Sequence, residues 1–220
     1  MEGLTGLSIG RLATDLGLSK SGVATLFGSK ERLQLAAADA AREAFIDAVV
    51  RPASAAPSGA ARLRALTGHW ISYAEAPLFP GGCFWAANLP EFDSRPGPVR
   101  DALLAHRREW LALLAGELRR AAERGEAAVP DAELAAFQID AVLTAANTAL
   151  RLGDGTAPDK ARRTVEGLLA SPEPAPRGTD PRRGGPGTGA DGPQPAGWAS
   201  AIAASTRARA ASAGWAPMRT

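Results

Sequence analysis

The chain has 220 residues, of which 45% are hydrophobic and 22% charged, and its formal net charge is +2 at pH 7. This length and apolar content suffice for two small domains with a shared core. The sequence contains no apolar run of the ~20 residues that span a bilayer, no signal-peptide pattern and only one cysteine. These features argue against a membrane protein or a disulfide-stabilised secreted protein, and we expect a soluble, cytoplasmic protein.

The charge is unevenly distributed along the chain. Residues 171–220 contain six Arg against three acidic residues, so the remaining 170 residues carry a net charge of −1. The body is therefore not a generally basic nucleic-acid-binding protein. Any affinity for DNA would come from a local basic cluster, doubled by dimerisation. Its members are Arg11, Lys20, Lys30 and Arg32.

Residues 9–27, IGRLATDLGLSKSGVATLF, have the pattern of a helix-turn-helix. Apolar residues at three- and four-residue spacing predict the first helix, namely Ile9, Leu12, Ala13 and Leu16. Gly17 suits a left-handed turn, Leu18 should fill that turn, and Ser19 is a good N-cap for the second helix. We expect the second helix to face the first through Val23, Leu26 and Phe27, and the small Ala13 to allow a close crossing.

The outward side of the second helix is the candidate DNA-binding face, and it carries Ser19, Lys20, Ser21, Ala24 and Thr25. The next helix should begin after Ser29, where free backbone N–H groups and the Lys30 ammonium suit a DNA phosphate. Two short helices joined by a glycine turn also occur in helical proteins that never bind nucleic acid. The pattern alone leaves both interpretations open.

At these residues the chain resembles the DNA-binding region of TetR/AcrR-type transcriptional regulators, and in particular a subgroup with the pattern SKSG-x-x-x-x-FGSKE-x-LQLA. The matching positions are Ser19, Lys20, Ser21, Gly22, Phe27, Gly28, Ser29, Lys30, Glu31, Leu33, Gln34 and Leu35. Residues 81–84 (GGCF) and 91–100 (EFDSRPGPVR) are similar to the C-terminal domain of that subgroup. The resemblance covers about residues 3–170. It implies an all-helical dimer that releases DNA when a small ligand fills the second domain.

The sequence departs from the family in two places. Family members carry a further helix before the one that begins near Ser8, and only seven residues precede it here. Either the true start lies upstream of Met1, or the N-terminal helical unit at residues 1–45, which we call the head, is less tightly packed. We expect Leu12, Leu16 and Val23 to lose part of the packing that shields them from water. Many relatives also carry an aromatic residue or His near positions 24–26, where this chain has Ala, Thr and Leu.

Apolar periodicity and breakers predict the remaining elements, all of them helical. A helix from Ser29 to Arg51 connects the head to the body, and Pro90 to Pro98 should form an ordered loop. The other expected helices are Ala60–Glu75, Cys83–Leu89, Val99–Arg124, a helix capped by Asp131 that ends near Leu152, and a last helix from Pro158. Residues 171–220 contain eight Pro and eight Gly, which predicts disorder. We favour a non-functional extension there over a basic tail that touches DNA through Arg207 and Arg209.

The last two helices carry a candidate dimerisation surface, because small residues let helices approach closely. Its predicted members are Phe137, Ala141, Ala145, Ala149 and Leu168. Ordinary packing within one chain is the alternative, and the resemblance favours a symmetric four-helix interface. Two recognition helices would then enter successive major grooves of a palindromic operator, ~34 Å apart.

Most aromatic residues of the body fall on three helices, at Ala60–Glu75, Cys83–Leu89 and Val99–Arg124. They predict a pocket for a hydrophobic or aromatic ligand, lined by Trp70, Tyr73, Phe84, Trp85, Asn88, His106 and Trp110. Core packing is the alternative for each residue, and His106 by itself reads as a hydrogen-bonded core histidine.

No residue pattern indicates catalysis, a metal site or a cofactor. No basic residue or His adjoins Cys83 to lower its pKa, so a buried structural thiol is expected. Glu91 and Asp93 should form a salt-bridged turn with Arg95 and Arg100. A small enzyme that uses Cys83 or His106 lacks a plausible catalytic partner in the sequence.

The sequence therefore predicts a helix-turn-helix domain at residues 1–45, a ligand-binding and dimerisation domain at 46–170, and a tail at 171–220. The expected function is a ligand-responsive transcriptional regulator, a repressor released from double-stranded operator DNA by its ligand. The alternative is a degenerate relative that binds a ligand or a partner but no longer binds DNA.

Overall fold

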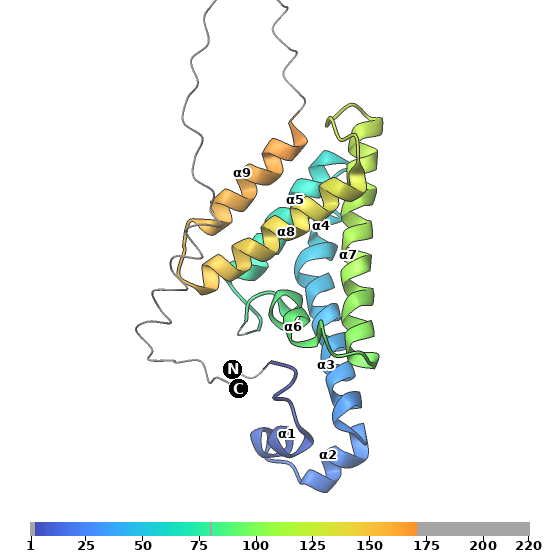
Figure 1. Cartoon of the computed structure of the whole chain (residues 1–220), viewed down its shortest axis with the longest axis vertical. Coiled ribbons are helices and arrows are strands. Elements are labelled where there is room, and N and C mark those ends of the chain that lie inside the picture. The colour runs from blue at the N-terminus through green and yellow to red at the C-terminus, as the bar shows by residue number, and fades with distance from the viewer. Residues whose placement is uncertain (1–2, 80, 171–220) are drawn as a thin grey trace, which may run out of the picture. The chain divides into compact units, whose positions relative to one another are not determined.

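The computed structural model describes residues 3–79 and 81–170, and within these ranges the fold is entirely helical, as predicted (Figure 1). The elements are α1 (Ile9–Leu16), α2 (Lys20–Phe27), α3 (Lys30–Phe45), η1 (Ile46–Val50), α4 (Arg51–Ala53), α5 (Ala60–Glu75), α6 (Phe84–Phe92), α7 (Pro98–Glu123), α8 (Ala132–Arg151) and α9 (Ala157–Leu169). No described helix is long and apolar enough to cross a membrane. The predicted disorder of residues 171–220 lies outside the described residues.

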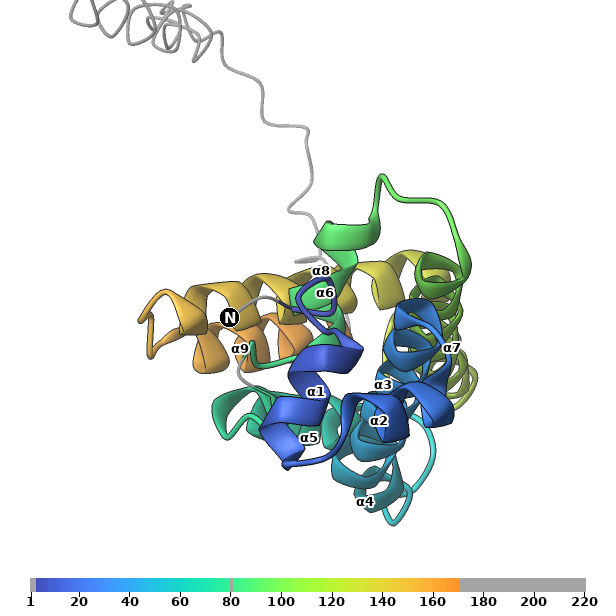
Figure 2. The ribbon, with the colours of Figure 1, turned by 90° about the horizontal axis from the view of Figure 1, so that it is seen from below.

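Helices α1 and α2 form the predicted helix-turn-helix, and Figure 2 shows them in front of the body helices. The Ser19 hydroxyl accepts a hydrogen bond from Gly22 N at 3.0 Å, which makes it the N-cap of α2. Gly17 ends α1 with φ 64°, a left-handed conformation that glycine adopts without strain. Ala13 and Val23 are buried, so the close crossing at Ala13 is confirmed.

Two apolar residues of the head do not have the predicted environment, and a third is exposed as expected. Leu18 is 53% exposed and Leu26 is 76% exposed, so neither fills the turn or faces α1. Because successive helical residues are ~100° apart, Leu26 lies about 60° to one side of Val23, away from Phe27. Val23 is buried and Leu12 half-buried, whereas Leu16 is 59% exposed, so the expected loss of cover falls on Leu16.

Helix α3 leads from the head into the body. Its N-cap is Ser29, whose hydroxyl accepts from Arg32 N at 3.1 Å. The predicted helix continues to residue 53, but residues 46–50 form a π-helical turn that the sequence did not indicate. Such turns occur often at functional sites.

The body packs α7 against α3, α5, α6 and α8, while α9 covers α5 and α8. The apolar stripe predicted on α7 is buried at Val99, Leu103, Leu114 and Leu118. One charged residue lies among them: Glu117 is 1% exposed. Asp131 caps α8 by accepting from Leu134 N, as predicted.

Helix α6 differs from the prediction at its end. It continues through Pro90 to Phe92, where the sequence indicated a loop. Proline lacks the N–H that would continue the helical hydrogen bonds. Asn88 and Phe92 are both buried, and their packing on either side of Pro90 holds the turn in place.

Candidate effector cavity and DNA-binding face

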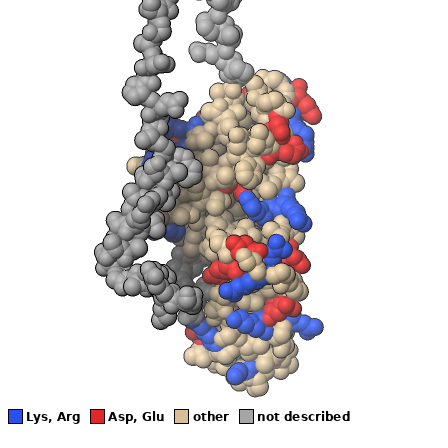
Figure 3. Space-filling view, in the orientation of Figure 1, with Lys and Arg blue, Asp and Glu red and all other residues tan. Residues whose placement is uncertain are grey.

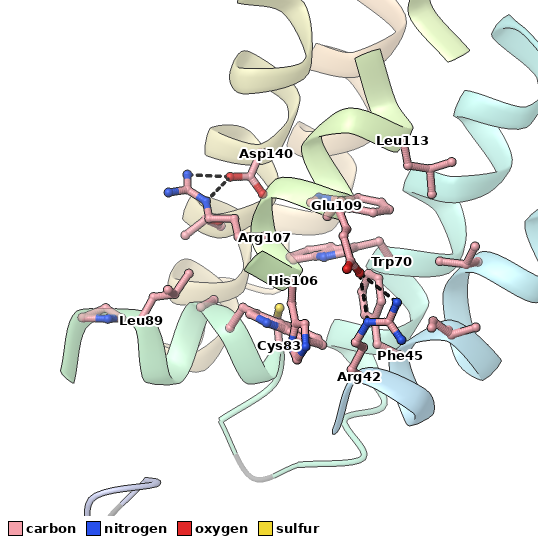
Figure 4. A pocket seen from close by; sticks show the side chains of 17 residues that line it. Arg42, Phe45, Trp70, Cys83, Leu89, His106, Arg107, Glu109, Leu113 and Asp140 are labelled. Atoms are coloured by element: carbon pink, nitrogen blue, oxygen red, sulfur yellow. Dashed lines mark hydrogen bonds and ion pairs between the residues drawn. The ribbon is translucent and has the colours of Figure 1, made fainter. Parts of the chain in front are cut away.

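A cavity of about 340 Å³ opens among α3, η1, α5, α6, α7 and α8 (Figure 4). Its volume lies within the range of small-molecule sites in proteins. The lining residues are Arg42, Phe45, Ile46, Val50, Trp70, Cys83, Trp85, Ala86, Leu89, Pro90, His106, Arg107, Glu109, Trp110, Leu113, Asp140 and Thr144. The π-helical turn contributes Ile46 and Val50 to this wall.

The cavity brings together four of the seven residues predicted to bind a ligand: Trp70, Trp85, His106 and Trp110. Tyr73, Phe84 and Asn88 lie outside the lining, contrary to the prediction. Tyr73 Oη instead accepts from Phe84 N at 3.4 Å, and Phe84 packs in a second core cluster with Leu4. The Asn88 amide accepts from Leu4 N at 2.8 Å, so α6 turns its Phe84 and Asn88 side away from the cavity.

Phe45 is the centre of the aromatic wall, and the sequence assigned it only to a connecting helix. Its ring centroid lies 5.1 Å from Trp85, 5.3 Å from Trp110 and 5.6 Å from Tyr73. All three pairs are edge-to-face, the arrangement that aromatic quadrupoles favour. The signal in the sequence was the spacing of Ala41, Phe45 and Val49, which marks one buried face of the connecting helix.

Two ion pairs stand at the cavity wall, and Figure 4 draws both. Arg42 Nη2 lies 2.8 Å from Glu109 Oε2, and the hydrogen bond that Arg42 donates to this carboxylate raises the pKa of Arg42. Arg107 Nη2 lies 2.7 Å from Asp140 Oδ2. Arg107 is half-buried and reaches from α7 to α8, although it lies beside the apolar stripe of α7.

Three buried side-chain nitrogens of the described residues have no hydrogen-bond partner, and all three belong to the cavity lining. They are Trp85 Nε1, His106 Nδ1 and Trp110 Nε1. His106 is therefore not the fully hydrogen-bonded core histidine that was expected; its Nε2 lies 3.8 Å from Asp39 Oδ1. Burial, together with the charge of Arg42, lowers the pKa of His106.

Cys83 is a buried free thiol, as predicted, and burial raises its pKa to about 11. Asn147 fixes the segment before α6, because its Oδ1 accepts from Cys83 N at 2.9 Å and its Nδ2 donates to Gly81 O. Gly82 has φ 78°, and a Cβ there would lie 2.1 Å from Asn147 Oδ1. Only glycine fits this bend.

The predicted DNA-binding residues share the outer side of α2. Lys20, Ser21 and Thr25 are exposed and Ala24 is half-buried. The Thr25 hydroxyl donates to Ser21 O at 2.9 Å, and Ser19 is occupied as the N-cap. On the face drawn in Figure 3, basic and acidic side chains are interspersed, with no broad field of one sign.

A short segment at residues 3–5, which we call the strap, connects the head to α6. Leu4 is buried, and Gln34 Nε2 donates to Leu4 O at 2.6 Å. Lys30 Nζ, the predicted phosphate ligand, donates to Thr5 O at 2.5 Å. Glu91 on α6 accepts from Thr5 N, and Arg100 donates to the backbone carbonyl of Asp93, so these contacts replace the salt-bridged turn expected at residues 91–100.

Helix α8 presents an exposed apolar stripe. Phe137 is 56% exposed, and Ala141 and Ala145 are also exposed. Leu134 and Leu152 extend the stripe at its two ends. Of the other residues predicted for dimerisation, Ala149 and Leu168 are half-buried, and Leu168 packs against the core of the same chain.

The comparisons with known proteins agree with this arrangement. Residues 59–165 match the family described as tetracyclin repressor-like, C-terminal domain. No curated protein matches the chain significantly.

Several solved structures share the fold. A TetR transcriptional regulator from Chloroflexus aurantiacus J-10-FL is 27% identical with a TM-score of 0.67, over 74% of this chain and 83% of that chain. SCO4454, a TetR-family transcriptional regulator from Streptomyces coelicolor, is 23% identical with a TM-score of 0.66, over 76% and 86%. AibR, solved with isovaleryl coenzyme A and operator DNA, is 18% identical with a TM-score of 0.60, over 76% and 89%.

The geometry first defines a class: an all-helical protein in which a helix-turn-helix precedes a helical domain with an internal cavity. The matched domain and the shared fold then support the TetR family. The match to the family model is confined to residues 59–165. The finer subgroup suggested by residues 19–35 stays a prediction.

Proposed function

We propose that this protein is a ligand-responsive, DNA-binding transcriptional regulator that acts as a dimeric repressor. One observation carries the proposal. Only two residues separate helix α3 from the candidate recognition helix, and the other end of α3 forms part of the cavity wall through Arg42 and Phe45. A ligand in the cavity therefore contacts the same element that orients α2.

The mechanism is a shift in population between two conformations of the head. The DNA-bound conformation sets two recognition helices ~34 Å apart through the α8 and α9 surfaces of two copies. A ligand that binds better to a conformation with another spacing lowers the affinity for the operator. The strap supplies a second connection between the cavity and the head, because α6 lines the cavity on one side and binds residues 4 and 5 on the other.

The solved structure of AibR, in complex with isovaleryl coenzyme A and operator DNA, supports the part of the proposal that gives this fold both a DNA site and a small-molecule site. Ser19, Lys20, Ser21, Ala24 and Thr25 are proposed to face DNA, with Lys30 at a phosphate. The Lys30 ammonium has three donors, so its hydrogen bond to Thr5 O leaves two for a phosphate oxygen.

The decisive experiment is a selection of genomic DNA fragments by the purified protein, followed by gel-shift titration of the enriched fragment. We expect an enriched palindromic site that is bound by a dimer at low salt. Failure to enrich any duplex would contradict the proposal.

A second candidate function is ligand binding without DNA binding. The observation in its favour is the exposure of Leu16, Leu18 and Leu26 on the head, which leaves apolar surface in water and weakens the support of α1 and α2. Under this alternative the protein binds small molecules in the cavity, while α1 and α2 show rapid amide hydrogen exchange and no duplex is retained.

A further inference from the structure

The charges at the cavity are already neutralised by one another. Among the described lining residues, Arg42 pairs with Glu109 and Arg107 pairs with Asp140. An ionised ligand would meet a carboxylate beside each guanidinium, so it would have to break an ion pair or lie next to a like charge. The cavity therefore disfavours both anions and cations.

Two of the three buried polar atoms that remain unsatisfied at the cavity can act only as hydrogen-bond donors. An indole nitrogen donates and cannot accept, so Trp85 Nε1 and Trp110 Nε1 each require an acceptor atom. His106 Nδ1 adds a third unpartnered nitrogen. Because these nitrogens are buried without a partner, an acceptor atom of a ligand that reaches them forms a hydrogen bond that replaces none to water.

Apart from Cys83 and Thr144, the rest of the wall is aromatic or aliphatic, with Phe45, Trp70 and Leu113 among its members. A flat apolar body would pack against these rings. A pure hydrocarbon would fill the same space but would leave both indole N–H groups without an acceptor.

We propose that the cavity selects an uncharged molecule with an aromatic or apolar body and one or more carbonyl-type acceptor oxygens. These oxygens accept hydrogen bonds from Trp85 and Trp110. This inference rests on the proposed function and specifies its ligand. Ketones, esters and amides of bicyclic aromatic compounds belong to this class. Carboxylates and amines of the same shape are excluded by the paired charges.

The test compares three probes with one ring system by calorimetric titration of the full-length protein. They are 2-acetylnaphthalene, which carries a neutral acceptor, 2-ethylnaphthalene, which has none, and 2-naphthoate, which is charged. We expect 2-acetylnaphthalene to bind at least tenfold more tightly than either of the others. Equal affinities, preference for the carboxylate, or no binding by any of the three would overturn the proposal.

Two variants locate the effect at the indole nitrogens. Trp110→Phe and Trp85→Phe keep an aromatic ring and remove the N–H donor. Each should weaken 2-acetylnaphthalene binding by about tenfold, which is about 1.4 kcal/mol. The affinity for 2-ethylnaphthalene reports the loss of ring size alone and should change much less. Parallel losses for both probes would show that the donors play no part.

A second measurement distinguishes an error in the ligand class from an error in the proposed regulatory function. Release of the selected DNA fragment is measured by gel shift with the same probes. Binding of 2-acetylnaphthalene without release of DNA would contradict the proposed function and leave the ligand class intact. Release by 2-naphthoate alone would contradict the ligand class and leave the regulatory function intact.

Discussion

Glu117 lies on α7 with 1% of its surface exposed, and three donors surround its carboxylate. Gly59 N and Arg120 Nη2 each donate at 2.7 Å, and Arg62 Nη1 lies 3.7 Å away. Burial raises the pKa of Glu117, but the hydrogen bonds from Arg120 and Gly59 and the charge of Arg62 outweigh burial and place the pKa below its usual value. Glu117 thereby holds the start of α5, which has no side-chain cap of its own.

We predict that Glu117→Gln lowers the free energy of unfolding by about 2 kcal/mol, because Arg62 and Arg120 lose their counter-charge. The measurement is urea unfolding at pH 7. Since the pKa of Glu117 is lowered in the folded state, the difference between the two proteins should shrink as the pH falls below about 4.5, where the carboxylate becomes protonated.

Glu123→Gln is the matched control for this substitution. Glu123 lies on the same helix but is exposed, so its loss should change the free energy of unfolding by less than about 0.5 kcal/mol. Equal effects of the two substitutions would show that the buried carboxylate has no special role.

Lys20 is exposed at the start of α2. We predict that Lys20→Ala weakens operator binding by roughly 3–10-fold at low salt and reduces the salt dependence of binding, because one phosphate contact is lost. Gel-shift titration at several salt concentrations measures both quantities. Arg108→Ala, which removes an exposed charge from α7, should leave them unchanged. Unaltered affinity in Lys20→Ala would remove Lys20 from the DNA-binding face.

The Cys83 thiol gives a prediction in alkaline solution. Its pKa is raised to about 11 in the folded protein from an ordinary value of 9.0. The raised pKa means that its stabilising contribution is complete below pH 9 and is lost as the pH rises toward 11. We expect wild-type stability to fall in this window by up to about 1.4 kcal/mol per pH unit relative to Cys83→Ala. Parallel curves for the two proteins would argue that the thiol is accessible to water.

At the scale of elements, helix α6 contacts the cavity with one side and the strap with the other. Trp85 and Leu89 line the cavity, whereas Asn88 and Glu91 bind the strap at Leu4 and Thr5. Gln34 and Lys30 on the first two turns of α3 bind the carbonyl groups of the same two strap residues. We therefore expect a displacement of α6 to reach the beginning of α3, next to the candidate recognition helix.

We predict that Gln34→Leu, which removes the donor to Leu4 O, leaves ligand affinity within about twofold and weakens the ligand's effect on DNA binding. Allosteric coupling is a free energy between two sites, so it can change while each site is retained. The measurement is the ratio of operator affinities with and without ligand. An unchanged ratio would contradict transmission through the strap.

At the scale of the whole molecule, the stripe on α8 is apolar surface that the rest of the described chain leaves uncovered. Phe137, Leu134 and Leu152 are large, and Ala141 and Ala145 between them are small enough for a second helix to approach. Asp140 and Thr144 on the same helix line the cavity. A contact between two copies at this stripe would therefore be coupled to the cavity through α8.

We predict that Ala141→Glu raises the dissociation constant of the proposed dimer at least tenfold, because a charge would be buried in the interface. Sedimentation equilibrium measures the change. Ala105→Glu is the matched control, since Ala105 is exposed in the middle of α7 and should tolerate the same substitution. Dissociation by both variants, or by neither, would argue against the α8 surface.

The sequence by itself determined the features that depend on neighbours within one or two turns of helix. The caps at Ser19 and Ser29 and the left-handed turn at Gly17 follow from local hydrogen bonds and backbone preferences. Apolar periodicity and the flanking Gly and Pro residues predicted the bounds of α5 and α7 to within one residue. The burial of Val99, Leu103 and Leu114 follows from helical periodicity. These interactions are nearly the same in any fold that contains the segment.

The tertiary structure alone decided how side chains from distant segments meet. Arg107 turned to Asp140, 33 residues away, and Glu117 was buried against Gly59, 58 residues away. Phe45 joined the aromatic wall because Trp85, on another helix, packs against its ring. Leu26 became exposed because no element covers that side of α2 among the described residues. Sequence periodicity gives the side of a helix on which a residue lies, but the choice of the neighbour on that side depends on the packing of the whole chain.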